Sequence, residues 1–347
     1  MKHRQPQLPE GLEALLVTRP ENVRYLSGFT APEDAILLYA PERTTLFTDA
    51  RYETQAPEEA WVPVEIVNPR GGYGFLQPHF AGLRVGYEGD HLPCSRKHKI
   101  EAETGVQLTP TSGVVEKARV VKTEDEIEQI AAAARLSDEG LQHLLPLVKP
   151  GVRELDLALE LEFWLRKSGA EKAAFDFIVA SGPRGALPHG VASGKKLQAG
   201  ELVTIDFGAV IGGYHSDMTR TLALGEVSAE LRRAFGAVLQ ALEEALEATR
   251  PGIVASELDA VARQVIEEAG FGPRFVHSLG HGVGLEIHEA PFLNSRSEEV
   301  LEPGMVVTLE PGVYLPGVGG VRIEELVVVT ESETRLLSHS PRGWLEV

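Results

Sequence analysis

Two stretches of the sequence repeat each other and place an acidic residue at the same position. Residues 197–208 align without gaps onto residues 301–312, which matches Leu, Gly, Val and Thr and superposes Asp206 on Glu310. The offset is 104 residues (310 minus 206). Acids that a repeated pattern brings to one centre repel one another unless a cation lies between them, so the repeat points to metal binding.

The first stretch continues into a predicted β-hairpin that carries a second acid. Apolar residues alternate along 201–207, and the turn residues Gly212-Gly213 follow before a strand-like pattern resumes. A turn centred between Ile211 and Gly212 would place Asp206 directly opposite Asp217 on the same face, with Cβ atoms about 5 Å apart. We therefore interpret both aspartates as metal ligands.

The second stretch ends in the same kind of hairpin. Its turn is the glycine-rich segment from Pro316 to Gly320, and Gly317 lies midway between Glu310 and Glu324. The pattern predicts that these two glutamates also share one face of a hairpin.

Matching segments also precede the two stretches. Pro150-Gly151 matches Pro251-Gly252 at an offset of 101 residues (251 minus 150), and the acidic triplet from Glu154 matches that from Glu257 at 103 (257 minus 154). Each copy then runs as an amphipathic helix to a glycine. We interpret residues from about 124 to 330 as a duplicated α+β unit with pseudo-twofold symmetry, which can bring four carboxylates together.

Three histidines lie within twelve residues between the two acid pairs: His277, His281 and His288. The glycines on each side of His281 let the backbone approach closely. Carboxylates with one imidazole suit Mn²⁺, Co²⁺ or Zn²⁺. Two divalent ions would balance four carboxylates and can hold a bridging hydroxide, so hydrolysis is the natural chemistry.

In this order and context, five residues resemble the ligand set of the M24 metallopeptidases, whose catalytic domain has the pita-bread fold: Asp206, Asp217, His281, Glu310 and Glu324. The segments around them resemble the Xaa-Pro branch of that family, and so do 188–190 and 288–291. Segments 22–29 and 47–52 resemble the amino-terminal domain of prolidases and aminopeptidase P, so the likeness covers nearly the whole chain.

The resemblance implies two divalent metal ions held by those five residues, with Mn²⁺ favoured over Co²⁺ or Zn²⁺. It also places His189 and His288 where family members contact substrate and stabilise the tetrahedral intermediate, and Glu310 where it takes the proton from the attacking water. His277, Arg322 and Tyr314 would lie at the substrate or around the ligands.

For Arg322 an alternative stays open, in which it is a strand-face arginine paired with Glu324 or Glu325. Four other histidines match no family site and are expected to be structural or solvent-exposed: His79, His98, His143 and His215.

The activity implied is that of a dinuclear metal-dependent Xaa-Pro dipeptidase, a prolidase, which cuts before proline in di- or short peptides and is usually a homodimer. An Xaa-Pro aminopeptidase acting on longer peptides stays open, because the arginine that some prolidases carry after His-Glu-x-Pro is here Phe292. A carboxylate-binding arginine would then come from Arg43 or Arg51 across a dimer. A non-catalytic peptide-binding scaffold and a creatinase-like amidinohydrolase are disfavoured because all five ligands are present.

The expected architecture is an α+β pita-bread domain with internal duplication over residues 119–347, preceded by a smaller α/β domain over 1–118. The Thr123–Glu126 capping box opens a helix through about Leu145. Further helices are expected at 153–168, 228–249 and 255–269.

Composition excludes several other classes. The 347 residues carry 33 Lys and Arg against 51 Asp and Glu, a formal charge of −18, which disfavours nucleic acid and anionic membrane as partners. Cys94 is the only cysteine, so no intrachain disulfide is possible. Without an apolar signal core or a long apolar run, the chain is expected to be cytoplasmic.

Overall fold

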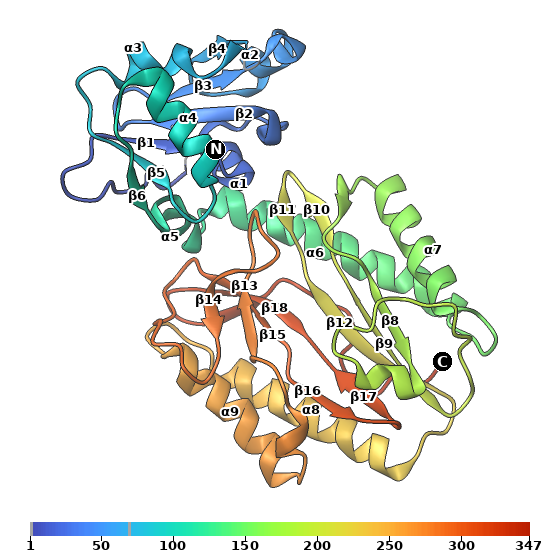
Figure 1. Cartoon of the computed structure of the whole chain (residues 1–347). Helices are drawn as coiled ribbons and strands as arrows, with labels where there is room; N and C mark the ends of the chain where they lie inside the picture. The colour runs from blue at the N-terminus through green and yellow to red at the C-terminus, as the bar shows by residue number, and fades with distance from the viewer. Residues whose placement is uncertain (1–2, 69–70) are drawn as a thin grey trace. The chain divides into compact units, whose positions relative to one another are not determined.

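The computed structural model describes residues 3–68 and 71–347 and divides the chain into two compact units (Figure 1). The smaller unit ends at Arg119, and the larger begins at Val120. Among the described residues, no helix has the length and apolar character needed to cross a membrane.

The smaller unit is built on a mixed six-stranded sheet in the order β4-β3-β2-β1-β5-β6. The strands are β1 Ala14–Val17, β2 Ala35–Tyr39, β3 Thr45–Thr48, β4 Val64–Ile66, β5 Val85–Glu88 and β6 Thr109–Thr111. The helices are α1 Pro20–Ser27, α2 Gln55–Glu59, α3 Gln77–Phe80, α4 Cys94–Thr104 and α5 Val114–Val120. The central strands β1 and β2 are buried along their whole length, as expected for strands covered on both faces.

Four long helices frame the larger unit, and their bounds agree with the predicted ones to within one residue. They are α6 Glu124–Leu144, α7 Glu154–Lys167, α8 Ala229–Ala248 and α9 Ala255–Glu268. The predicted capping box is present at α6: Thr123 Oγ1 accepts from Glu126 N, and Glu126 Oε2 accepts from Thr123 N at 2.8 Å.

The strands of the larger unit lie between these helix pairs, with α6 and α7 on one side and α8 and α9 on the other (Figure 1). The first set is β7 Lys172–Ala173, β8 Ile178–Ser181, β9 Glu201–Phe207, β10 Ala209–Ile211, β11 Tyr214–His215 and β12 Met218–Leu224. The second set is β13 Gly280–Gly282, β14 Glu289–Leu293, β15 Val306–Leu309, β16 Gly312–Leu315, β17 Gly319–Arg322, β18 Glu325–Val329 and β19 Thr334–Leu336.

The predicted duplication appears as one set of backbone hydrogen bonds formed twice, in copy one (residues 124–224) and copy two (residues 229–329). The bond from Gly151 N to Leu197 O matches that from Gly252 N to Leu301 O. The bond from Gly200 N to Leu224 O matches that from Gly304 N to Val329 O, and the bond from Ala170 N to Leu165 O matches that from Phe271 N to Ile266 O. Equivalent residues in the two bonds of each matched pair are 101 to 105 positions apart in the chain. The repeat seen in the sequence is therefore also a repeat in three dimensions.

One detail of the predicted repeat is wrong. Helices α7 and α9 begin at Glu154 and Ala255, which are 101 residues apart, so Glu154 corresponds to Ala255 and not to Glu257. The matched backbone hydrogen bonds on each side of the two helices set this correspondence, whereas the acidic triplets match in residue type only, and Glu257 is exposed. Glu154, by contrast, is completely buried.

The first hairpin also differs from its predicted register. Ile211 pairs with Tyr214 across a two-residue turn, Gly212-Gly213, in which φ is 58° and 83°. Only glycine adopts such angles at both positions without strain, so the turn is centred one residue later than predicted. Asp206 therefore lies opposite Thr219, and Asp217 is its diagonal neighbour on the same face.

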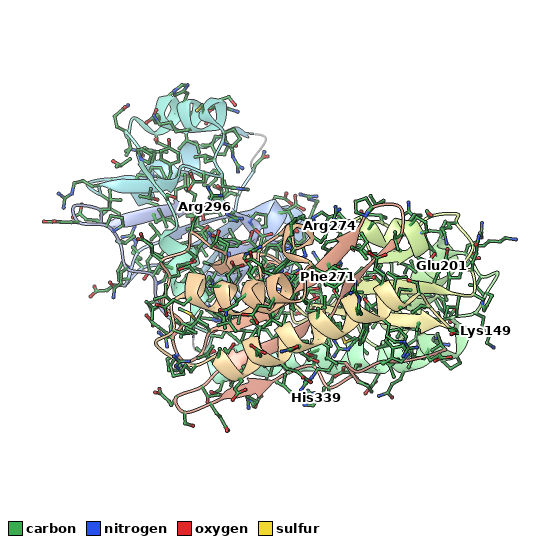
Figure 2. The ribbon with its side chains drawn as sticks, turned by 90° about the horizontal axis from the view of Figure 1, so that it is seen from below. Lys149, Glu201, Phe271, Arg274, Arg296 and His339 are labelled. Atoms are coloured by element: carbon green, nitrogen blue, oxygen red, sulfur yellow. The ribbon has the colours of Figure 1, made fainter. Side chains whose placement is uncertain are left out.

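Each copy packs its own helices against its own strands. In copy one, Val203, Ile205 and Phe207 of β9 join the apolar faces of α6 and α7, which leaves Thr204 and Asp206 on the opposite face. In copy two, Val307 and Leu309 of β15 pack with α8 and α9. Figure 2 views the α8 and α9 side, with Phe271 and Arg274 labelled in the connection after α9. Burying a side chain such as Phe207 contributes roughly 1.5–3 kcal/mol, so both cores hold their acid-bearing strands firmly.

Candidate metal centre

The two hairpins bring their four acids to the middle of the larger unit. Glu310 and Glu324 face each other as predicted, because the flanking pairs are Leu309 with Glu325 and Gly312 with Arg322. Carboxylate oxygens of Asp206, Asp217 and Glu324 lie within 4.8 Å of one another. One cation can therefore contact acids from both copies.

His281 completes the cluster from strand β13. Its Nε2 lies 3.3 Å from Glu310 Oε1 and 3.6 Å from Asp217 Oδ2. A Cβ added at Gly280 would overlap the carbonyl oxygen of Thr308, and one at Gly282 would overlap that of Ala290. The glycines around the histidine thus permit the close backbone approach that the sequence suggested.

The chemistry of these donors fits a cation. Asp206, Asp217, His281 and Glu324 are all buried, and Glu324 is only 1% exposed. Among the described residues, Asp206 Oδ1 and Glu324 Oε1 are buried oxygens without a hydrogen-bond partner. A buried carboxylate oxygen left unpaired is costly, and a metal ion is the partner that would satisfy several at once.

Electrostatics at the centre lead to the same interpretation. Burial, with the charges of Glu324 and Asp206, raises the pKa of Asp217 well above its ordinary value, and burial with the charges of Glu310 and Asp206 does the same for Glu324. Burial also raises the pKa of Glu310, but the hydrogen bond and charge of His281 outweigh it and bring that pKa down to about 2. Burial lowers the pKa of His281, yet Glu310 reverses the shift and raises it. The acids therefore compete for positive charge.

Arg322 pairs with Asp206 and not with the neighbouring glutamates that the alternative prediction named. Its Nη2 donates to Asp206 Oδ2 at 2.5 Å, and its Nε donates to Thr219 Oγ1 at 3.1 Å. Glu325 pairs instead with Arg220 at 2.8 Å. The buried Arg322 guanidinium thus orients one carboxylate of the centre.

A relay of hydrogen bonds extends from Arg322 to His277. Arg322 Nη1 donates to the Tyr314 hydroxyl oxygen at 2.8 Å. The Tyr314 hydroxyl in turn donates its own proton to His277 Nε2, 2.8 Å away. His277 Nδ1 lies 2.8 Å from the Ser278 carbonyl oxygen, which fixes its proton on that nitrogen. Burial raises the pKa of Tyr314 to about 12 and lowers the pKa of His277, so both stay neutral donors at neutral pH.

A cavity of about 420 Å³ opens beside the acids. His189 and His288 both line it, and the His288 ring lies 4.3 Å from the ring of His281, centroid to centroid. Burial and the charge of His281 lower the pKa of His288, which keeps it neutral. The apolar part of the wall comes from Phe175, Ile178, Pro188, Val191 and Phe292.

Two threonines at the centre were missed in the sequence. Thr219 Oγ1 donates to Glu324 Oε2 at 2.7 Å. Thr308 Oγ1 donates to Glu310 Oε1 at 3.3 Å and accepts from His281 N at 3.0 Å. The signal for Thr308 was available, because it is one of the residues matched between the aligned stretches.

Another missed contact is the buried ion pair between Lys122 and Glu289, with 2.7 Å between Nζ and Oε1. It fixes the residue after His288. No spacing relates Lys122 to position 289, so only the folded chain reveals this pair.

Two histidines of the larger unit that matched no family site lie away from the cavity wall. His215 is buried, with Nδ1 3.1 Å from the carbonyl oxygen of Gly284. His143 stacks on Trp164 and contacts Glu160 at 2.8 Å.

Comparisons with known proteins agree with this picture. The sequence matches the model of metallopeptidase family M24 over residues 128–331 and that of the creatinase/prolidase N-terminal domain over residues 9–121. It is 38% identical to the Xaa-Pro dipeptidase of Pyrococcus furiosus, over 96% of this chain and 95% of the relative.

Solved structures give the same relationship. The Xaa-Pro dipeptidase from Bacillus anthracis is 41% identical with a TM-score of 0.93, over 97% of this chain and 96% of that one. The X-Pro aminopeptidase from Thermotoga maritima is 37% identical with a TM-score of 0.91, over 97% and 98%. The predicted α+β architecture, with a smaller amino-terminal domain, is confirmed.

Proposed function

Because this chain belongs to metallopeptidase family M24 and is therefore a metal-dependent peptidase, we propose that it is an Xaa-Pro dipeptidase, which hydrolyses the bond before proline. The observation that supports this most is the convergence of four acids and His281 beside an apolar cavity. The dipeptidases of Pyrococcus furiosus and Bacillus anthracis, similar over nearly the full chain, support the substrate class.

We propose that five residues hold two divalent cations: Asp206, Asp217, His281, Glu310 and Glu324. Such ions, when bound, supply a Lewis acid and lower the pKa of water to roughly 7. The chain's own part is to hold the acids in place, through Arg322 on Asp206, Thr219 on Glu324 and Thr308 on Glu310. These bonds keep the carboxylates from moving apart.

The remaining polar residues of the cavity would handle protons and charge. Glu310, ionised at neutral pH, is in the protonation state that a general base needs. A neutral His288 can donate an N–H to the negative charge that develops on the substrate carbonyl, and His189 lines the same cavity. Both histidines are exposed to the cavity, where a substrate can reach them.

The apolar wall suits a proline ring. Proline offers no N–H, so a site that selects it must rely on contact with the ring more than on a hydrogen bond. Such contact can come from the apolar residues of the wall, Phe175, Ile178, Val191 and Phe292. Burial of the ring against them stabilises binding by about 25 cal/mol per Å² of apolar surface removed from water.

A second candidate is an Xaa-Pro aminopeptidase that acts on longer peptides. Of the cavity-lining residues in the part of the chain that the structure describes, Arg322 is the only Lys or Arg, and Asp206 and Tyr314 occupy its guanidinium. Among these lining residues, a dipeptide's carboxylate would find no Lys or Arg side chain that is not already paired. In the smaller unit Arg51 pairs with Asp34 at 2.7 Å and with Asp49 at 2.8 Å, and Arg43 is exposed. Arg51→Ala or Arg43→Ala with unchanged dipeptide preference would remove that residue as a clamp.

Hydrolysis of Ala-Pro against Ala-Pro-Ala tests the proposal, with metal-stripped protein refilled with Mn²⁺. Activity on the dipeptide alone is expected. Activity on the tripeptide alone would establish the aminopeptidase, and no activity on either peptide by the metal-loaded protein would overturn the Xaa-Pro assignment.

We further propose Mn²⁺ as the native metal, a homodimer as the working assembly and the cytoplasm as its location. The absence of disulfide pairing, with Cys94 as the lone cysteine, suits a reducing compartment. Metal analysis of protein purified without added metal and its mass in solution would check the first two.

A further inference from the structure

We propose that Glu154 is a positioning residue, which holds the loop that carries His189 against the cavity. This inference rests on the proposed function, which takes the cavity lined by His189 as the substrate site. The loop runs from Ser181, at the end of β8, through the 3-10 helix η6 (Gly182–Ala186) to Ser193.

The Glu154 carboxylate bonds to both ends of this loop. Its Oε1 accepts from Ser181 N and Ser181 Oγ, each at 2.8 Å. Its Oε2 accepts from Ser193 Oγ at 2.6 Å and Ser193 N at 3.2 Å. One side chain therefore joins both ends of the segment. The backbone bond from Ala192 N to Phe177 O at 3.3 Å and the bond from Lys195 Nζ to Ser181 Oγ at 2.8 Å also link the chain around these ends. The Glu154 carboxylate, however, bonds to Ser181 and Ser193 at once.

Arg184 carries the same connection into the middle of the loop. Its Nε donates to Glu154 Oε2 at 2.9 Å, and its Nη2 donates to the Val191 carbonyl at 2.6 Å. The residues between them include Pro188 and His189. The Pro188 carbonyl in turn accepts from Arg322 Nη1 at 3.1 Å, which ties the loop to the Asp206 carboxylate.

The other copy shows that the fold itself does not require this glutamate. The helix that corresponds to α7 is α9, and it begins with Ala255 at the equivalent position. If the Glu154 carboxylate served only to begin helix α7, it would not need the five hydrogen bonds that it accepts from the loop 181–193. Burying a charge is costly unless it is fully paired, so the pairing is best explained by the loop that it holds.

Copy two holds its own histidine segment with a different carboxylate. Asp259 is buried and accepts from Leu279 N at 3.0 Å and from Arg263 Nε at 2.6 Å. Arg263 Nη2 then donates to the His277 carbonyl at 2.5 Å. In both copies an acid on the second helix and an arginine fix a segment that carries a cavity histidine.

The test compares Glu154→Gln with Asp138→Asn. Asp138 is also buried in the larger unit and accepts from the backbone N–H groups of Ser340 at 2.7 Å and His339 at 2.9 Å, but these lie in the C-terminal segment (His339 in Figure 2). Glu154→Gln is expected to lower kcat/KM for the Xaa-Pro peptide about 10- to 100-fold, because small misplacements of catalytic groups cost that much. Asp138→Asn is expected to leave kcat/KM unchanged. Equal losses in the two variants would overturn the proposal.

A double variant identifies the residue through which Glu154 acts. If it works by placing His189, Glu154→Gln added to His189→Ala causes no further loss in kcat/KM. Losses that multiply would show independent action and overturn the proposal. Should Glu154→Gln fold poorly, Ser193→Ala removes one of the five donors to Glu154, together with the acceptor for Lys195 N, and is expected to give a smaller loss with the same non-additivity.

Hydrogen exchange tests the clamp independently of activity. Amides of residues 182–192 are expected to exchange faster in Glu154→Gln than in the unmodified protein, whereas Asp138→Asn leaves them unchanged. Unchanged exchange would overturn the proposal even if activity fell. If the unmodified protein cleaves no Xaa-Pro peptide, the proposed function fails, and exchange still decides whether Glu154 holds the loop.

Discussion

The two copies within the larger unit share a backbone but differ in the chemistry that they contribute. The ladder places Asp206 opposite Thr219 in copy one, and the flanking pairs place Glu310 opposite Glu324 in copy two. Thr219 therefore corresponds to Glu324. By the same spacing, Asp217 corresponds to Arg322.

This correspondence shows that the copies exchange charges. Copy one has an acid and then a neutral residue, Asp217 and Thr219, whereas copy two has a cation and then an acid, Arg322 and Glu324. Thr219 donates to Glu324, and Arg322 donates to Asp206, so each copy holds an acid of the other. Arg220 and Glu325, also at equivalent positions, form an ion pair.

The histidine is likewise found in one copy only. Ser181 pairs with Val203 in copy one, and Gly282 pairs with Val307 in copy two, so His281 corresponds to Ala180. A duplicated scaffold thus supplies matched positions, and different residues at those positions make an asymmetric site. Two metal ions bound in such a centre, as proposed above, would then differ in affinity and in task.

The largest effect is expected when His281 of copy two is replaced by alanine, the residue that copy one has at the equivalent position, Ala180. His281→Ala should lower kcat/KM by more than about 100-fold, since even partners around a metal site cost 10- to 100-fold. Steady-state kinetics and metal stoichiometry measure this. The control is His143→Gln, which removes a histidine of helix α6 and should retain full activity. Near-normal activity in His281→Ala would show that the two copies need not differ at this position.

Arg322→Lys keeps the charge of copy two but removes the planar fork that bonds to Asp206 and Tyr314. Metal affinity is expected to fall about 10- to 100-fold with the fold intact. Calorimetric titration with Mn²⁺ and circular dichroism are the measurements. An unchanged affinity would mean that Asp206 needs only a nearby charge.

The raised pKa values of Asp217 and Glu324, one from each copy, predict how pH affects the metal-stripped protein. An acid whose pKa is higher when folded binds more protons in the folded state, so stability falls as pH rises above the ordinary values of 3.8 and 4.5. The melting temperature should therefore drop between pH 5 and pH 8 without metal and hold steady with Mn²⁺. Asp217→Asn should flatten the metal-free slope; a slope that stays the same would assign it to other groups.

The smallest effect concerns the first helix of each copy. Thr123 caps α6 within a capping box, and Ser228 caps α8 by accepting from Leu231 N at 3.3 Å. Thr123→Ala and Ser228→Ala should each lower the free energy of unfolding by about 1 kcal/mol without changing activity. Urea denaturation measures both, and a larger loss at Thr123 would reflect the second bond of its box.

The sequence by itself determined the fold class, the four long helices and the duplication. These follow from local signals: apolar periodicity, the capping box at Thr123 and the aligned stretches around Asp206 and Glu310. It also identified the five residues that the structure brings together. The spacing of the four acids within two hairpins is short-range information, which strand geometry converts into position, whereas His281 lies on the separate strand β13.

Only the tertiary structure decided which side chains meet across the two copies. The sequence allowed Arg322 to pair with the nearby Glu324 or Glu325, but in the folded chain it donates to Asp206, 116 residues away. The correspondence of Glu154 with Ala255 and the Lys122–Glu289 pair were decided in the same way. The register of the first hairpin was set locally, by the Gly212-Gly213 turn. The physical reason is that a long-range contact depends on how whole strands and helices pack, and a change of one turn residue alters which side chains face each other.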